Sequence, residues 1–297
     1  MKTVQVLLST YNGEKYLREQ IDSILTQDGV NVKLLVRDDG SKDSTISILR
    51  EYGNRINVIY GDNVGPYKSF LVLLDLCDDA DYYSFSDQDD VWLKDKLISG
   101  VKALENEKNK IPLLYCSSLQ RVNEKLELES VQSFPKLKTN IYSALVRERL
   151  AGCTFVFNNM LRNLLKGSSK LDLNYSHDSW SVLMCYACGG KVVFDRIPHI
   201  LFRRYGTNVS VDGGGLKKRI KHEFRYLNKC KDQRYNAVKV LIKFKREYIV
   251  EKDILEEIVQ YKDSIRNTIK FALNKNMDCG IKISNLINRF IILSRNI

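Results

Sequence analysis

The sequence predicts an α/β protein in which a doubly wound, mostly parallel sheet is flanked by helices and followed by a helical C-terminal extension. Three observations support this fold class. Four short apolar runs alternate with amphipathic helical patterns over roughly the first 90 residues, as in strand–helix–strand units. A polar loop follows each apolar run. Beyond residue 212 the pattern becomes helical and basic.

The first two strand–helix units follow from hydrophobic periodicity. A buried strand is expected at Val4–Thr10, followed by the turn Tyr11-Asn12-Gly13 and a helix from Glu14 onward. A second buried strand at Lys33–Arg37 ends at the loop Asp38-Asp39-Gly40-Ser41, which leads into the second helix.

The next two units repeat this arrangement. A third strand is expected at Ile56–Tyr60, with the turn Asn63-Val64-Gly65-Pro66 before its helix, and a fourth at Tyr82–Ser86. The loop Asp87-Gln88-Asp89-Asp90 follows it. Because ligands of such sheets bind outside the carboxyl ends of the strands, we expect the four polar loops to form one site. Four unrelated solvated turns are the alternative.

The acidic loop favours a divalent metal. Three carboxylates this close repel one another unless a cation lies among them, and Mn2+ or Mg2+ prefers oxygen ligands and leaves positions for phosphates. A solvated acidic loop is the other interpretation. The sequence lacks G-x-G-x-x-G after the first strand and lacks G-x-x-x-x-G-K-[ST], which disfavours dinucleotide binding and Walker-type ATP hydrolysis. The four loops together fit a nucleoside diphosphate with a metal.

The following segment has a mixed pattern. A helix near Lys94–Glu107 precedes strands that we expect to complete the same sheet, and an apolar helix begins at His177-Asp178-Ser179-Trp180. The stretch Gly213-Gly214-Gly215 is a natural hinge. The strands expected here are Leu113–Leu119, Thr154–Phe157, Lys191–Phe194 and Ile200–Tyr205.

Charge separates the tail from the body. The net charge is +11, yet residues 1–212 carry 27 Lys and Arg against 27 Asp and Glu, whereas residues 213–297 carry 20 against 9. We therefore expect a domain at 1–212, with a nucleotide-binding half at 1–110 and an acceptor half at 111–212, and a basic extension at 213–297. A nucleic-acid partner is disfavoured because no reading module is visible.

Two interpretations of the extension stay open. Its helices either pack on the domain with solvated basic faces, or lie on an anionic membrane surface. The apolar stripes that suggest a membrane are Leu216, Ile220, Phe224 and Leu227, and near the end Ile283, Leu286, Ile287, Phe290 and Ile291.

Composition predicts a cytoplasmic location. No signal-peptide pattern follows Met1, and no apolar run approaches the roughly 20 residues of a membrane span. Seven cysteines scattered without a framework favour reduced thiols.

Six motifs resemble a known family. Three of them, in this order and spacing, resemble the family 2 glycosyltransferases of GT-A fold, a Rossmann-like architecture, and the likeness covers roughly residues 3–210. Of the other three, the first resembles the acceptor-side Gly-Cys-Thr segment, and the last two resemble the bacterial rhamnosyltransferase-like branch. The first three motifs are Leu8–Gly13, Asp38–Thr45 and Phe85–Trp92, and the others are Ala151–Phe155, His177–Trp180 and Phe202–Asn208.

The resemblance implies a role for each matching residue. The metal, Mn2+ or Mg2+, would be held by Asp89, and Asp178 would be the catalytic base. The nucleotide-sugar would be bound by Thr10, Tyr11, Asp39, Asp87 and Arg203. The acceptor would be bound by Gly152, Cys153, His177 and Trp180. Tyr205 stands where the family has a histidine, which affects the expected ligand count of the metal.

The implied activity is inverting transfer of a sugar from a UDP- or dTDP-sugar to a saccharide acceptor. The acceptor would be lipid-linked, in capsule, O-antigen or cell-wall glycan synthesis, with the enzyme in the cytoplasm or peripheral on the inner face of the membrane. One alternative is a non-catalytic sugar-nucleotide-binding subunit or partner of another transferase. A phosphatase with an aspartyl nucleophile is disfavoured, because Ser9-Thr10-Tyr11 stands after the first strand, where that class carries its Asp-x-Asp.

Overall fold

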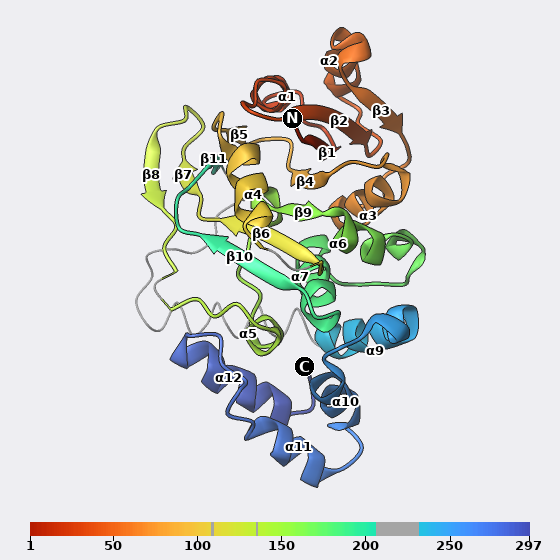
Figure 1. Ribbon diagram of the computed structural model, residues 1–297, viewed down its shortest axis with the longest axis vertical. Helices are drawn as coiled ribbons and strands as arrows, with labels where there is room; N and C mark the ends of the chain where they lie inside the picture. Colours follow the sequence, from red (N-terminus) through yellow and green to blue (C-terminus); the bar gives the residue numbers. More distant parts are fainter. Residues whose placement is uncertain (108–109, 135, 206–231) are drawn as a thin grey trace. The chain divides into compact units, whose positions relative to one another are not determined.

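The computed structural model describes residues 1–107, 110–134, 136–205 and 232–297 (Figure 1). Contacts within the chain define two compact units. The first unit comprises residues 1–133, 150–170 and 190–206, and the second comprises 134–149, 171–189 and 207–297. The sequence predicts a domain boundary at residue 212. The contact-based grouping differs from it, because the segments 134–149 and 171–189 are assigned to the same unit as the C-terminal helices. The expected hinge at Gly213–Gly215 and the stripe from Leu216 to Leu227 lie outside the described residues.

A seven-stranded sheet forms the centre of the first unit, in the order β10-β6-β9-β4-β1-β2-β3. β1 pairs in parallel with both β2 and β4, while β9 runs antiparallel to its neighbours β4 and β6. The predicted fold class, a mostly parallel sheet flanked by helices, is therefore confirmed. The strands are β1 (Thr3–Thr10), β2 (Asn31–Asp38), β3 (Asn57–Tyr60), β4 (Tyr82–Ser86), β6 (Leu113–Ser117), β9 (Val156–Asn158) and β10 (Lys191–Asp195).

Helices cover both faces of this sheet. One face, which carries Val4, Val6 and Leu8 of β1, packs against α1 and α4 in the main hydrophobic core. On the opposite face, the Ser9 hydroxyl of β1 donates to the hydroxyl of Ser69 in α3 at 2.6 Å. The helices of this unit are α1 (Leu17–Leu25), α2 (Thr45–Glu51), α3 (Pro66–Leu76), α4 (Lys96–Glu105) and α6 (Asn159–Leu165).

A second, four-stranded sheet lies in the same unit, in the order β5-β11-β7-β8. The strand expected at Ile200–Tyr205 belongs here rather than to the main sheet, where it had been expected. Val91 and Trp92, directly after the acidic loop, form the short strand β5, and β11 pairs with it in antiparallel orientation. This pairing brings residues near 203 to the acidic loop. The strands are β5 (Val91–Trp92), β7 (Gln120–Val122), β8 (Leu128–Val131) and β11 (Ile200–Arg203).

The second unit is helical within its described residues. Trp180, Tyr261 and Phe271 are buried in it, and α5 packs against α7 as α11 packs against α12. None of the helices in the described ranges has the length and apolar character needed to cross a membrane. The helices are α5 (Ile141–Val146), α7 (His177–Ala187), α9 (Gln233–Lys245), α10 (Lys252–Gln260), α11 (Ile265–Ala272) and α12 (Lys282–Leu293).

Candidate functional site

Gln88 ties the loop after β4 to the loop after β1. Its side-chain oxygen accepts hydrogen bonds from the Thr10 hydroxyl at 2.7 Å and from the Tyr11 backbone N–H at 2.8 Å. Its amide nitrogen donates to the Tyr11 carbonyl at 3.2 Å. Gly13 lies beside it, and an added Cβ would lie 2.5 Å from the Gln88 oxygen, so a larger residue there would displace the Gln88 side chain. Thr10 is buried and Tyr11 is exposed, so of these two predicted nucleotide-binding residues only Tyr11 presents its side chain to solvent.

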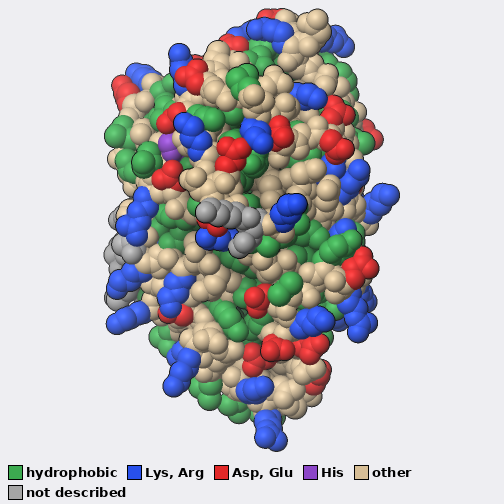
Figure 2. Space-filling view, in the orientation of Figure 1, with side chains coloured by type: hydrophobic (Ala, Val, Ile, Leu, Met, Phe, Trp, Pro, Cys, Tyr) green, Lys and Arg blue, Asp and Glu red, His purple; other side chains and the backbone are tan. Residues whose placement is uncertain are grey.

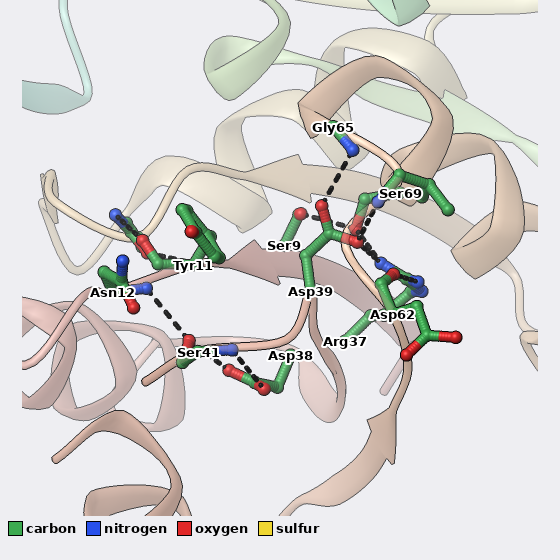
Figure 3. Close-up of polar contacts among 12 residues, drawn as sticks. Ser9, Tyr11, Asn12, Arg37, Asp38, Asp39, Ser41, Asp62, Gly65 and Ser69 are labelled. Carbon is green, nitrogen blue, oxygen red and sulfur yellow. Dashed lines mark hydrogen bonds and ion pairs between the residues drawn. The ribbon is translucent and has the colours of Figure 1, made fainter. Parts of the chain in front are cut away.

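The loop after β2 joins the same edge (Figure 3). The backbone N–H of Asn12 donates to the Ser41 hydroxyl at 2.9 Å, and the Asn12 side chain accepts from the Lys42 N–H at 2.9 Å. Asp38 accepts from the Ser41 N–H at 3.0 Å. The loops after three neighbouring parallel strands are therefore held together by side-chain hydrogen bonds, as expected for the ligand-binding edge of such a sheet.

Asp39 is the polar centre of this edge. Its carboxylate forms an ion pair with Arg37 and accepts from the N–H groups of Val64 at 3.0 Å and Gly65 at 2.9 Å (Figure 3). Arg37 also donates to the Asp62 carbonyl at 2.9 Å. Only 2% of Asp39 is exposed. Its two oxygens thus fix the loop after β3, and a base or ribose would have to share an oxygen that the protein already uses.

The acidic loop brings three possible metal-ligating atoms together. One oxygen of Asp87, one of Asp90 and the sulfur of Cys153 lie within 4.8 Å of one another. Asp90 is buried; its Oδ1 accepts from the Arg203 N–H at 3.2 Å, and its Oδ2 has no hydrogen-bond donor among the residues that the structure describes. Burial and the charges of Asp89 and Asp87 hold the pKa of Asp90 well above its ordinary value. The residues present therefore fit a divalent cation.

Asp89, the predicted metal ligand, lies outside this group of three. Its Oδ2 accepts a hydrogen bond from the Tyr205 hydroxyl at 2.6 Å. Burial raises the pKa of the Asp89 carboxyl, and the bond from Tyr205 acts in the opposite direction. Asp89 and Asp87 are both partly exposed, whereas Asp90 is not, so a ligand arriving from solvent meets the first two.

Arg203, predicted to lie by the diphosphate, is buried beneath the acidic loop. Its Nε donates to the Asp89 carbonyl at 3.0 Å, its terminal nitrogens contact Glu19 and the Glu124 carbonyl, and its guanidinium lies 4.3 Å from the centre of the Tyr16 ring. Only 2% of Arg203 is exposed. In this arrangement the Arg203 side chain holds the backbone of the acidic loop from the protein interior and does not face solvent.

Lys96 lies behind the same loop and is fully buried. Its Nζ donates to the Ser84 hydroxyl at 2.7 Å and lies 3.4 Å from the centre of the Trp92 ring. Burial lowers the pKa of Lys96 to about 7, against smaller opposing effects of Cys153 and Asp90. A lysine is rarely buried without such contacts. Through them, Lys96 packs against the residues on either side of the acidic loop.

The predicted acceptor-side residues are divided between the two units. Gly152 and Cys153 lie in a short 3-10 helix of the first unit. The sulfur of Cys153 lies next to the acidic loop. His177, Asp178 and Trp180 lie in the second unit, at the N-terminus of α7.

The N-terminal turn of α7 begins at Ser176. Its hydroxyl accepts from the Ser179 N–H at 3.4 Å, and the same N–H donates to the Asp178 carboxylate at 2.7 Å. Burial lowers the pKa of His177 to about 4, so its imidazole is neutral at pH 7. Trp180 is fully buried, and a contact with an acceptor would require its surroundings to open.

A cavity of about 430 Å³ lies within the second unit. It is bounded by the segment that precedes α7 and by α9. Amides, two lysines and a carboxylate dominate its lining, a donor and acceptor mixture that suits a polar ligand. The polar residues around it are Asp172, Asn174, Gln233, Asn236, Lys239 and Lys243.

Residues 5–165 match the family model described as "Glycosyl transferase family 2". The match covers more than half of the chain. The protein belongs to glycosyl transferase family 2. The predicted family is thereby confirmed, and the matched residues include the loop after β1 and the aspartates of the loops after β2 and β4.

Two curated proteins named as glycosyltransferases resemble the chain over part of its length. "Uncharacterized glycosyltransferase RP339" of Rickettsia prowazekii is 29% identical over 180 residues, which is 59% of this chain and 56% of that protein. "dTDP-rhamnosyl transferase RfbG" of Shigella flexneri is 38% identical over 105 residues, 33% of this chain and 36% of that protein. The chain thus matches less than two thirds of the length of either relative.

A solved structure resembles the whole chain in fold. The crystal structure of S. aureus TarS 1-349 in complex with UDP-GlcNAc superposes with a TM-score of 0.60 at 17% identity, over 99% of this chain and 91% of that one. At this identity the likeness concerns the fold alone. It agrees with the α/β fold class described above.

Two residues of the site were missed by sequence reasoning. Gln88 stands between two predicted ligands, and Lys96 follows the motif by four residues. Gln88 could have been found from its position at a strand end, where polar side chains of a family 2 glycosyltransferase converge. The sequence does not predict the burial of Lys96. Its neighbours Lys94 and Asp95 are also charged, and three consecutive charged residues are typical of an exposed turn.

Proposed function

We propose that the protein is a metal-dependent, inverting glycosyltransferase. It transfers one sugar from a UDP- or dTDP-sugar to a saccharide acceptor, carried on a lipid during assembly of a bacterial surface polysaccharide. The observation that carries the proposal is the bonding of Gln88 to Thr10 and Tyr11, which joins the acidic loop to the first strand end. A nucleoside diphosphate bound along that edge would have its phosphates beside the carboxylates.

The names of the relatives support this donor class. RfbG is called a dTDP-rhamnosyl transferase, and the TarS structure contains UDP-GlcNAc. Both names contain a pyrimidine nucleoside diphosphate, dTDP or UDP. Tyr11, exposed at the end of β1, is available to stack on such a base.

We assign the metal to the exposed side of the acidic loop. Asp87 and Asp89 are partly exposed and would hold it, while Asp90 supports the loop from inside through its bond from Arg203. A divalent cation, when bound, stabilises the negative charge that develops on the leaving diphosphate. The alternative is a metal held by Asp87 and Asp90, since one carboxylate oxygen of each lies within 4.8 Å of the other.

Asp178 is the proposed catalytic base. Inverting transfer is one in-line displacement, so a carboxylate must take the proton of the acceptor hydroxyl on the face opposite the leaving group. A carboxylate oxygen can accept this proton directly.

The polar cavity of the second unit supports a saccharide acceptor. Sugar hydroxyls both donate and accept hydrogen bonds, and the amides of Asn174, Gln233 and Asn236 offer both functions. The cavity-lining segment Asp172–Asn174 lies just before α7 in the sequence, and Asp178 is the second residue of α7.

Thermal-shift measurements with UDP, dTDP and GDP, each with and without Mn2+, test the donor site. We expect Mn2+ and UDP or dTDP together to raise the Tm more than either alone. No metal-dependent stabilisation by any nucleotide would contradict the proposal.

A panel of nucleotide sugars then separates an enzyme from a non-catalytic sugar-nucleotide-binding subunit. The readout is release of nucleoside diphosphate in the presence of saccharide acceptors. An enzyme releases it with at least one donor, whereas the subunit binds nucleotide and releases none.

A further inference from the structure

Helix α11 exposes a stripe of large apolar side chains. Ile265, Ile269 and Leu273 are 72%, 45% and 67% exposed, and their spacing of four residues places them on one side of the helix. The helix already has an inner face, formed by Thr268, Phe271 and Ala272. The exposed stripe is therefore additional to the packing of the unit.

Helix α12 repeats the feature. Leu286, Phe290 and Leu293 are 53%, 57% and 49% exposed at a helical spacing, whereas Ile287 and Ile292 are buried inside the unit. The sequence had grouped Ile287 with the outward stripe, and the structure divides these residues between two faces. Because α11 and α12 pack against each other, both stripes belong to one two-helix element.

Basic side chains surround the two stripes. Residues 265–297 contain six Lys and Arg and a single acidic residue, Asp278, which is paired with Lys138. Six of the nine acidic residues of the tail lie instead at 247–263, on and around α10. Apolar and Lys or Arg side chains accordingly lie together in the lowest part of Figure 2, where Figure 1 shows α11 and α12. The six basic residues, all exposed, are Arg266, Lys270, Lys275, Lys282, Arg289 and Arg295.

We propose that α11 and α12 form a surface that docks on a bilayer containing anionic lipid. Exposed apolar side chains flanked by Lys and Arg are the composition of helices that lie in the membrane interface. The apolar residues would enter the headgroup region while the basic ones contact lipid phosphates. A symmetric contact with a second copy fits less well, because it would bring two sets of basic residues together without acidic partners.

The acidic segment at 247–263 gives the docked unit an orientation. An anionic surface attracts the basic helices and repels acidic side chains such as Asp253 and Glu256, so α10 would stay away from the lipid. This surface agrees with a lipid-linked acceptor, and in that respect the inference deepens the proposed function. Docking itself needs no transfer of sugar.

Co-sedimentation with vesicles tests the inference on the full chain. The probes are vesicles of phosphatidylcholine alone and vesicles with a third of phosphatidylglycerol. We expect binding to the anionic vesicles only, weakened by added salt. The double variant Ile269→Ser/Phe290→Ser should bind at least tenfold less, and Arg266→Gln/Arg289→Gln should lose about fivefold per charge. Equal binding of neutral and anionic vesicles, or unchanged binding by both variants, would overturn the proposal.

Matched control variants test whether the loss of any exposed apolar or basic residue weakens vesicle binding. Ile197→Ser and Lys102→Gln remove an exposed apolar and an exposed basic residue from the first unit, and should bind vesicles as the unaltered protein does. Sedimentation velocity without lipid examines the other occupant: a dimer that the Ile269→Ser/Phe290→Ser variant turns into a monomer would overturn the membrane assignment. Nucleotide binding, followed by thermal shift in the same samples, separates failure of docking from failure of the proposed activity.

Discussion

The hydroxyl of Tyr205 donates a hydrogen bond to Oδ2 of Asp89 at 2.6 Å. Tyr205 occupies the position where the resemblance leads one to expect a histidine, and Asp89 is the proposed metal ligand. The tyrosine therefore contacts the carboxylate that we propose to hold the metal. Its ring also lies 5.2 Å from that of Tyr16, which belongs to the segment before α1. A phenol at this place occupies a carboxylate oxygen that a metal could use.

We first predict the effect of altering Tyr205. Tyr205→Phe frees Oδ2 of Asp89 and should tighten Mn2+ binding severalfold, while the loss of one hydrogen bond costs about 1 kcal/mol of stability. Tyr205→His adds a nitrogen ligand and should tighten binding further. Calorimetric titration with Mn2+ in the presence of UDP measures both. Weaker metal binding by Tyr205→Phe would mean that the phenol holds Asp89 in its binding position.

Asp178→Asn should abolish transfer and leave donor binding intact. An amide cannot accept the acceptor proton, so kcat should fall about 10²- to 10⁴-fold. Asp253→Asn is a matched control, because Asp253 is likewise the second residue of a helix, α10, in the same unit. Asp89→Ala should also abolish transfer, but together with metal-dependent nucleotide binding. Near-normal turnover by Asp178→Asn would remove the assignment of the base.

Gln88→Ala tests the link between the first and fourth strand ends. The change leaves the Tyr11 N–H and the Thr10 hydroxyl without their acceptor, so the two loops should separate. We expect the KM for the donor to rise about tenfold, equivalent to one good hydrogen bond, with a smaller change in kcat. Gln88→Glu keeps the acceptor oxygen and should recover part of the lost affinity, despite its added charge. An unchanged KM in Gln88→Ala would show that the loops hold their positions without it.

Asp39→Asn should lower the free energy of unfolding by about 3 kcal/mol, because it leaves the buried guanidinium of Arg37 without its charge partner. Asp62→Asn is the control in the neighbouring loop, since Asp62 is exposed and offers Arg37 only its carbonyl. Urea unfolding measures both variants. Equal stability of the two would show that the ion pair contributes nothing net.

Lys96 makes stability depend on pH. Burial lowers its pKa from 10.5 to about 7, so between these values the unfolded chain holds a proton at Lys96 that the folded protein releases. The free energy of unfolding should therefore rise with pH above 7, by up to about 1.4 kcal/mol per pH unit from this group. Lys96→Met should remove that rise, while Lys102→Met, on the exposed side of the same helix, should keep it. Urea unfolding at pH 7, 8 and 9 gives the comparison. Parallel pH profiles of the unaltered protein and Lys96→Met would contradict it.

The parallel core of the fold could be predicted because its signals are local. β1, β2, β3 and β4 each carry an apolar run that ends in polar residues, and the predicted bounds differ from the observed ones by at most two residues. The small sheet was not foreseen, since its strand β5 has two residues and joins β11 from more than 100 residues away. Pairings of that separation leave no periodicity in the sequence.

Side-chain roles were harder to predict than positions. Asp39 was placed correctly after a strand, whereas Arg203 was expected inside a strand and is the last residue of β11. Both are buried and bonded to the protein, and their predicted contacts with the donor stay predictions. A motif specifies which residue stands at a loop, but the direction of its side chain depends on distant partners such as Glu19 and Gly65. Asp178 and Asp89 lie in different units, so the sequence alone joins them into one catalytic proposal.

The buried Arg203 has a consequence for engineering donor specificity. One guanidinium contacts Glu19 before β2, Asp89 after β4 and Glu124 after β7, so three separate segments share a single anchor. A loop transplanted from another transferase would arrive without the matching carboxylate or carbonyl positions. Exchange of the acidic loop therefore requires exchange of the segments around Glu19 and Glu124 as well, and directed evolution should find paired rather than single substitutions there.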